Sequence, residues 1–245
     1  MLKTLLFDLD GTLLPFDQNR FMHGYFHALL PEIAHLVNTK EIAAQILTAT
    51  QTMVENEDPQ LPNIDAFKNA FFGTVDVAEC DIWPIFDEFY RTKFGDLQSL
   101  TEPSPISREI CRSALSKGYE LVLATNPIFP DDAVRHRMAW ARIDDVPFKL
   151  VTTMEHMHFC KPSPKYYLEI LDRIGRSPEE CMMIGNDVQE DGVAGKLGMQ
   201  TFLVKDFVID RGVGHIEFTH EGSLKDVLSF IESLAVLEQN PTFPS

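Results

Sequence analysis

The stretch TLLFDLDGT, residues 4–12, decides the fold that we expect for this chain. Its apolar residues are consecutive rather than alternating, which predicts a strand over Thr4–Leu9 that is buried on both faces of a sheet. Asp8 and Asp10 fall at the end of this strand, and Gly11 allows the chain to turn sharply after them. Because ligands bind beyond the carboxyl ends of strands in doubly wound sheets, both carboxylates are candidate functional groups.

Four further apolar runs predict buried strands of the same kind, and helix-like stretches separate them. The expected strands are Glu120–Thr125, Phe148–Thr152, Cys181–Ile184 and Thr201–Val204. The clearest helical stretches are Asp132–Ile143, Pro164–Ile174 and Asp191–Leu197. Strands that alternate with helices predict an α/β fold built on a doubly wound parallel sheet of the Rossmann-like kind.

A long helical segment is inserted after the first strand. Between residues 16 and 95 the sequence contains no convincing strand and predicts four helices, which are Asn19–Val37, Lys40–Glu55, Ile64–Phe72 and Ile82–Phe94. The stretch TEPSP at 101–105 indicates a linker back to the sheet. We therefore expect a core domain of residues 1–15 and 100–245, with an inserted α-helical domain of residues 16–99.

Two stretches near the end of the chain are less regular. Residues 206–222 fit either a long loop or a short hairpin, and they precede a predicted final helix at Leu224–Leu234. Residues 239–245 contain two prolines, which predicts a loosely held tail.

The composition argues against several classes of protein. The chain has 21 Lys and Arg against 37 Asp and Glu, which gives a formal net charge of -16. A nucleic-acid partner is not expected, because such proteins carry a basic surface that attracts phosphates. A membrane partner is not expected either, since no apolar run has the length of a membrane span and the chain begins without a signal-peptide pattern. Four well-separated cysteines then favour a cytoplasmic protein with reduced thiols.

Polar residues follow three later strands of the predicted sheet. Thr125 and Asn126 lie at the end of the second strand. Either the Thr125 hydroxyl and the free backbone N–H groups after it bind a phosphate oxygen, or the two residues simply form a turn. Lys161 precedes a predicted helix and either reaches the crevice or is solvated. Asp187 and Asp191 are one helical turn apart, which indicates either a cation site or an acidic helix N-terminus.

These residues should converge on one crevice, because each lies at or just beyond the carboxyl end of a strand. Four carboxylates in such a place would repel one another by about 4 kcal/mol per pair at about 4 Å with an effective dielectric of about 20. One Mg²⁺ together with Lys161 supplies compensating charge. Mg²⁺ prefers oxygen ligands and commonly binds substrate phosphate as well, which makes it the expected cofactor.

Four motifs in this order resemble the haloacid dehalogenase (HAD) superfamily: DLDGT at 8–12, TN at 125–126, KP at 161–162 and GNDVQED at 185–191. The helical insert resembles the C1-type cap domain of that superfamily. The resemblance spans nearly the whole chain and implies a HAD core with an inserted α-helical cap domain. It also implies a phosphatase that acts on a small phosphorylated molecule.

The resemblance implies that Asp8 is the nucleophile, which becomes an aspartyl-phosphate. It implies that Asp10 protonates the leaving oxygen, then deprotonates the attacking water, and binds Mg²⁺ through its backbone carbonyl. Dehalogenating members of the superfamily resemble this chain but lack the second aspartate. The presence of Asp10 therefore favours phosphate chemistry.

The other motif residues receive roles by the same resemblance. Thr125 and Asn126 would bind the phosphate, together with backbone amides near them. Lys161 would neutralise the nucleophile and the transferring phosphoryl group. Asp187 would bind Mg²⁺ directly, and Asp191 would either bind it through water or orient Lys161.

Several alternatives remain open at this level. A phosphomutase of the same family would share these residues and differ in what its cap admits. A receiver-like phospho-acceptor also uses Asp, Thr, Lys and Mg²⁺, but the long insert argues against it. An inactive scaffold would be expected to lack motif residues, and none is missing here. Candidate substrate contacts in the cap are Asn19, Arg20 and His23, because they open its first predicted helix. The oligomeric state is not indicated.

Overall fold

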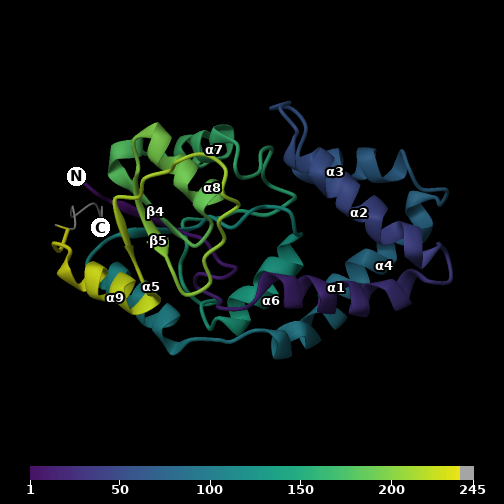
Figure 1. Cartoon of the computed structure of the whole chain (residues 1–245), viewed down its shortest axis with the longest axis horizontal. Coiled ribbons are helices and arrows are strands. Elements are labelled where there is room, and N and C mark those ends of the chain that lie inside the picture. Colours follow the sequence, from purple (N-terminus) through teal and green to yellow (C-terminus); the bar gives the residue numbers. More distant parts are fainter. Residues whose placement is uncertain (238–245) are drawn as a thin grey trace, which may run out of the picture.

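A parallel six-stranded sheet organises the computed structural model, which describes residues 1–237 (Figure 1). The strand order is β3-β2-β1-β4-β5-β6, and the strands are β1 Thr4–Phe7, β2 Glu120–Leu123, β3 Leu150–Val151, β4 Cys181–Gly185, β5 Gln200–Val204 and β6 His220–Gly222. In register, Leu6 of β1 lies opposite Val122 of β2 and Met183 of β4. The predicted doubly wound sheet is confirmed, and the order reverses between β1 and β4, where such sheets bind ligands.

Helices cover both faces of this sheet, which explains the consecutive apolar residues in its strands. One face carries α5 Pro105–Ser116 and α9 Leu224–Ser233, and the other carries α7 Pro164–Ile174 and the 3₁₀ helix η3 Gly192–Leu197. Successive side chains of β1 alternate between the two layers. Leu5 and Phe7 pack in the cluster with α5 and α9, whereas Leu6 packs in the cluster with α7.

The predicted helices between β1 and β2 are present and form a body beside the sheet (Figure 1). They are α1 Gln18–Ile33, α2 Thr39–Val54, α3 Asn63–Phe72, α4 Glu79–Arg91 and the 3₁₀ helix η1 Lys93–Leu100, and we call them the helical insert. Helix α1 begins where the side chain of Asp17 accepts a hydrogen bond from the Arg20 amide at 2.7 Å. This helix buries Phe21, Tyr25 and Leu29, which are spaced by four residues.

Aromatic side chains pack the helical insert against the segment that follows β2. Helix α6, Asp131–Trp140, follows β2 and carries Trp140, whose ring stacks on Phe94 of η1 at 5.5 Å between centroids. Tyr25 of α1 meets Phe129 edge-on at 5.6 Å. These contacts place α1 and η1 beside α6 and the loop that follows β2.

The structure differs from the sequence prediction in three places. Residues 206–222 form a long loop that ends in β6, which pairs parallel with β5, so the hairpin alternative is wrong. The predicted helix at Asp191–Leu197 is a single turn, α8 Val188–Asp191, followed by η3, because glycines at 192 and 195 weaken a regular helix. Helix α5 begins within the TEPSP stretch that was expected to be only a linker.

Two further results concern the sequence predictions. No helix among residues 1–237 is long and apolar enough to cross a membrane. The tail predicted to be loose, 239–245, lies outside the described residues. The remaining short element is the 3₁₀ helix η2 Pro178–Glu180, which precedes β4.

Candidate active site

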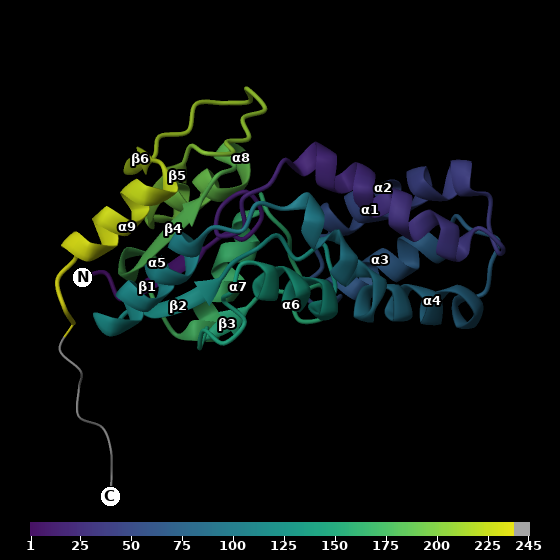
Figure 2. The same cartoon turned by 90° about the horizontal axis from the view of Figure 1, so that it is seen from below.

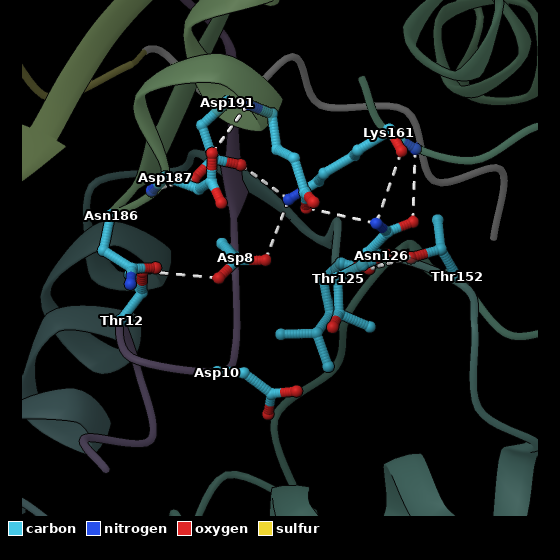
Figure 3. A network of polar contacts seen from close by, with 12 residues as sticks. Asp8, Asp10, Thr12, Thr125, Asn126, Thr152, Lys161, Asn186, Asp187 and Asp191 are labelled. Carbon is cyan, nitrogen blue, oxygen red and sulfur yellow. Dashed lines mark hydrogen bonds and ion pairs between the residues drawn. The ribbon is translucent and has the colours of Figure 1, made fainter. Parts of the chain in front are cut away.

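The residues that follow β1, β2 and β4 meet at one edge of the sheet (Figure 3). Asp8 follows β1 directly, and Lys161 approaches from the segment that precedes α7. Lys161 Nζ donates to Asp8 Oδ1 at 2.8 Å and to Asp191 Oδ1 at 2.6 Å. The lysine side chain is only 1% exposed, so it forms a desolvated bridge between two carboxylates.

Burial and charge act in opposite directions on this triad. Burial lowers the pKa of Lys161, but the adjacent carboxylates of Asp191 and Asp8 raise it well above its usual range, which keeps the ammonium charged. Burial raises the pKa of Asp8, and Lys161 opposes that shift. Burial also raises the pKa of Asp191, to about 7, against the same opposing effect of Lys161. The lysine therefore offsets much of the cost of burying two acids.

The second oxygen of Asp8 faces the loop after β1. Thr12 Oγ1 lies 3.5 Å from Asp8 Oδ2 and donates a shorter bond of 2.9 Å to Asn186 Oδ1. Asn186 in turn donates to the carbonyl of Phe207 at 2.6 Å. Gly11 has φ of 80°, and a side chain at this position would collide with Asn186. The turn after β1 therefore depends on glycine for its close approach to the β4 loop.

Asp10 forms an ion pair with Arg137 of α6, a residue that the sequence analysis missed. Arg137 is fully buried, donates from Nε to the carbonyl of Ala133 at 3.1 Å and lies over the Phe129 ring at 4.7 Å. Burial raises the pKa of Asp10, although Arg137 opposes the shift. Asp10 Oδ1 and Arg137 Nη2 are buried atoms without a hydrogen-bond partner in the part of the chain that the structure describes.

The position of Arg137 within its helix was a usable signal. Its neighbours Ala133, Val134 and Met138 are all buried, so the arginine is a lone cation on the apolar face of α6. A buried arginine requires an anionic partner. The sequence did not show which acid supplies it, because Asp10 is 127 positions away.

Asp187 and Asp191 each bind separate partners within the protein. Asp187 Oδ1 accepts from the amides of Gln189 and Glu190 at 3.0 and 2.9 Å, which caps α8. Asp191 Oδ2 accepts from the Asp187 amide at 2.9 Å, and its Oδ1 accepts from Lys161. Both oxygens of Asp191 are thus bonded within the protein, which orients Lys161.

Arg211 and Glu190 extend the charge network, and both were missed from the sequence. Arg211 Nη1 lies 2.7 Å from each oxygen of Asp187, and its Nη2 lies 3.3 Å from Glu190 Oε1. Burial, with Asp187 adding to it, raises the pKa of Glu190 to about 8. The loop that carries Arg211 runs past α8 (Figure 2), and Val188 donates to the Ile209 carbonyl at 2.9 Å. Glu190 lies inside the GNDVQED motif, but no sequence pattern indicates Arg211.

The loop after β2 is hydrogen-bonded to Lys161 and to Glu190. Asn126 Oδ1 accepts from the Lys161 amide at 3.2 Å, and its Nδ2 donates to Glu190 Oε2 at 3.1 Å. The carbonyl of Thr125 accepts from Thr152 Oγ1 at 2.7 Å and from the Tyr166 hydroxyl at 2.9 Å. These bonds fix the backbone of the loop, while Thr125 itself lines the cavity that contains Asp8.

That cavity has a volume of about 70 Å³ and is also lined by Asp10 and Asp187. Gln18 and Met22 of α1 contribute to its wall on the side of the helical insert. Of the predicted cap contacts, Asn19 lines a neighbouring hollow that Asp10 also borders. Arg20 and His23 are exposed and belong to neither lining, because their positions on α1 turn away from the side that bears Gln18 and Met22.

Comparison with curated proteins places these observations in a family. A family model of haloacid dehalogenase-like hydrolases matches residues 2–198. The glyceraldehyde 3-phosphate phosphatase of Methanothermobacter thermautotrophicus is 27% identical over 226 residues, which covers 89% of this chain and 92% of that protein. Pyrophosphatase PpaX of Anoxybacillus flavithermus is 26% identical over 200 residues, with 80% of this chain and 79% of that protein covered.

Solved structures share the fold at lower sequence identity. A HAD phosphatase from Thermococcus onnurineus superimposes with a TM-score of 0.60 and 18% identity, covering 96% of this chain and all of that one, 100%. This similarity extends over the sheet and the helical insert together.

Proposed function

Because the chain belongs to the haloacid dehalogenase-like hydrolases, we propose that it is a Mg²⁺-dependent phosphatase that cleaves a small phosphate monoester through an aspartyl-phosphate on Asp8. The observation that carries the proposal is the bonding of Lys161 to both Asp8 and Asp191 at the switch point of the sheet. A second carboxylate, Asp10, lines the same cavity. A nucleophile, an acid–base group and a cation are thus present together.

The proposed reaction has two steps. In the first, an Asp8 oxygen attacks the phosphorus in line, the bond to the leaving alcohol breaks, and Asp10 gives its proton to the alcohol oxygen. In the second, Asp10 takes a proton from water, and the water oxygen attacks the phosphorus. The bond to Asp8 then breaks and inorganic phosphate is released. The raised pKa of Asp10 suits a group that must carry a proton in the first step.

Lys161 and the loop after β2 would hold the phosphoryl group during both steps. The charged ammonium of Lys161 lies beside the attacking oxygen of Asp8 and offsets charge that builds up on the phosphoryl oxygens. Thr125 offers its hydroxyl from the cavity wall. Asn126 would contribute mainly by fixing this loop, because both ends of its amide are already bonded within the protein.

The donor groups fit Mg²⁺, which prefers oxygen ligands. Within residues 1–237 no three His, Cys, Asp or Glu side chains form a ready metal cluster. The proposed set is compatible with this, because it uses only the Asp8 and Asp187 side chains together with the Asp10 backbone carbonyl. Asp191 is assigned to Lys161 rather than to the metal, since both of its oxygens are bonded. When bound, Mg²⁺ supplies positive charge that neutralises phosphoryl oxygens.

We further propose that residues 16–99 act as a cap domain over a core of residues 1–15 and 100–245. The wall of the Asp8 cavity supports this division, because Gln18 and Met22 come from the helical insert while the reacting groups come from the sheet. The cap would then select the leaving group and exclude bulk water from the aspartyl-phosphate.

The direct test is hydrolysis of 4-nitrophenyl phosphate by the purified chain, with and without excess chelator. Activity should disappear on chelation and return with Mg²⁺, and calorimetry should detect binding of Mg²⁺ to the protein alone. Full activity in excess chelator would reject the metal assignment. Dependence on a sugar bisphosphate activator, with transfer to a sugar in place of release of phosphate, would identify a phosphomutase instead.

A further inference from the structure

A second hollow lies between the helical insert and the loops that follow β2 and β3. Its volume is about 220 Å³, and it is lined mainly by apolar and aromatic side chains from α1 to α4. They include Met22, Tyr25, Phe67, Trp83 and Phe86, and Phe129 of the loop after β2 lies among them. An apolar cavity of about 150 Å³ is large enough to bind benzene. This hollow therefore has room for one aromatic ring with a short substituent.

The hollow adjoins the Asp8 cavity. Both are bordered by the same four residues, which come from α1 and from the loop after β2: Gln18, Met22, Ile128 and Phe129. Gln18 and Met22 come from the helical insert, whereas Lys161, which bonds to Asp8, and Asp191 are in neither lining, so a leaving group that extends from Asp8 toward the insert would enter this hollow. The hollow is thus in the position that a leaving group would occupy.

The charges around the hollow are of one sign. Among residues 1–237, its lining contains the acids Asp87 and Glu155 but no Lys, Arg or His. The nearby Lys68 lies over the Trp83 ring at 4.1 Å and pairs with Glu79 at 2.8 Å, and it is not part of the lining. Arg137 lies behind the wall of the hollow, over the Phe129 ring, and pairs with Asp10. An anionic group in this hollow would lose its hydration and meet two carboxylates with no cationic side chain in the lining that residues 1–237 form.

The polar groups that remain suit an uncharged or positively charged ligand. The hydroxyls of Tyr25 and Tyr90 lie 2.6 Å apart on the wall of the hollow. The Glu155 carboxylate accepts from the Asp131 amide at 3.0 Å, which fixes its position at the start of α6. A protonated amine on a ligand would meet this acid and Asp87.

We propose that the substrate of this chain is a phosphate monoester whose leaving group is aromatic or otherwise apolar and carries no negative charge. The inference rests on the proposed phosphatase function and adds the class of leaving group to it. It sets this chain apart from an enzyme for pyrophosphate, whose leaving group is itself an anion.

The test compares three esters that share one ring and linker and whose para substituent is absent, cationic or anionic. They are 2-phenylethyl phosphate and its para-aminomethyl and para-carboxymethyl derivatives. We expect kcat/KM for the neutral and the cationic ester to exceed that for the anionic ester at least tenfold, and to exceed that for pyrophosphate by more. Equal or better hydrolysis of the anionic ester would overturn the inference.

A charge variant of the hollow provides the matched comparison. Thr50 of α2 lines the hollow and is half-buried, whereas Thr48 on the same helix is exposed and outside the lining. Thr50→Lys should raise kcat/KM for the anionic ester at least fivefold relative to the neutral ester, and Thr48→Lys should leave that ratio unchanged. The same shift in both variants, or in neither, would contradict a binding site at this hollow. Circular dichroism and thermal unfolding check that both variants fold.

Binding of the free alcohols separates this inference from the phosphatase function. Calorimetry with 2-phenylethanol and its two charged derivatives should give weaker binding for the carboxylate than for the other two. If the alcohols bind with this preference but none of the esters is hydrolysed, the phosphatase function fails and the selectivity of the hollow stands. If the esters are hydrolysed without any charge preference, the phosphatase function stands and the inference fails.

Discussion

Lys161 Nζ lies 2.8 Å from Asp8 Oδ1, although 153 positions separate the two residues in the sequence. The same ammonium lies 2.6 Å from Asp191 Oδ1, so one buried cation joins the loop that follows β1 to helix α8. Removing Lys161 would leave two buried acids without their cation, whereas removing one acid leaves the lysine paired with the other. This relationship determines how substitutions at the site should behave.

Replacing the proposed nucleophile should abolish turnover and leave the protein folded. Asp8→Asn is expected to lower kcat by roughly four orders of magnitude or more, as losses of catalytic nucleophiles do. The melting temperature should change little, because Lys161 keeps its bond to Asp191. Asp172→Asn is the control, since Asp172 is exposed on α7. Substantial turnover by Asp8→Asn would reject the mechanism.

Asp10→Asn should fail at a different step from Asp8→Asn. An aryl phosphate has a good leaving group and needs little protonation, so the variant should still transfer phosphate to Asp8 but hydrolyse the product slowly. Mass spectrometry of the intact protein after mixing should then show a gain of one phosphate. If no such species appears while slow turnover persists, Asp10 does not act as the base.

Arg137→Ala should both destabilise the protein and disturb Asp10. Removing one partner of a buried ion pair costs about 3–5 kcal/mol in the free energy of unfolding. Arg137 lowers the pKa of Asp10, so its loss should raise that pKa and move the alkaline limb of the kcat/KM profile to higher pH, because Asp10 must carry a proton in the first step. Urea unfolding and the pH profile measure the two effects.

The control for Arg137 lies two residues away on the same helix. Arg135 is exposed and pairs with Asp131, so Arg135→Ala should change stability by less than about 1 kcal/mol. Its pH profile should match that of the unmodified protein. An unshifted profile for Arg137→Ala would mean that the arginine is purely structural.

Gln18→Ala should weaken substrate binding, whereas Arg20→Ala should not. Gln18 lines the Asp8 cavity and the adjoining apolar hollow, while Arg20 is exposed and borders neither. Loss of one hydrogen bond would raise KM roughly 2- to 10-fold. Steady-state kinetics with the preferred ester measures KM for both variants. A larger rise in KM for Arg20→Ala than for Gln18→Ala would place the substrate on the outer side of α1.

Arg211→Gln should tighten Mg²⁺ binding. Arg211 contacts both oxygens of Asp187, a proposed ligand, and is half-exposed, so it competes with the metal for that carboxylate. Half-exposed ion pairs contribute up to about 1 kcal/mol, which corresponds to at most about a 5-fold fall in the Kd for Mg²⁺. Calorimetry measures the Kd for Mg²⁺, and Lys205→Gln in the same loop is the control. A higher Kd would show that Arg211 supports the metal site.

Glu120→Gln should change how stability depends on pH. Partial burial raises the pKa of Glu120, but hydrogen bonds from Lys149 and Arg176 outweigh it and hold the pKa below its usual 4.5. A lowered pKa stabilises the fold above pH 4.5, and that contribution disappears as the pH falls through the folded value. The variant should therefore lose about 1 kcal/mol at pH 7 and little at pH 3.

Urea unfolding at several pH values checks the Glu120 prediction. Glu221→Gln is the control, because Glu221 is more exposed and, within residues 1–237, pairs with Lys205 alone. Salt should reduce the difference between the Glu120 variant and the unmodified protein, since Glu120 is only partly buried. An equal loss at pH 3 and pH 7 would exclude an electrostatic origin.

The sequence by itself determined the sheet and the places where its polar residues gather. Consecutive apolar residues predicted strands covered on both faces, and the parallel order of those strands brings their carboxyl ends to one edge. That is why Asp8, Thr125, Lys161 and Asp187 could be assigned to one crevice from their positions after strands. The helices of the insert were equally visible from their periodic apolar positions.

Only the tertiary structure decided which partner each polar group has. The pairing of Asp10 with Arg137, of Asp187 with Arg211 and of Asp191 with Lys161 depends on helix rotation and on the path of the loop at 205–219. The same is true of the side of α1 that faces the cavity. A local pattern specifies an element and its buried face, but long-range contacts form only when separate elements pack, so their partners are set by the packed structure as a whole.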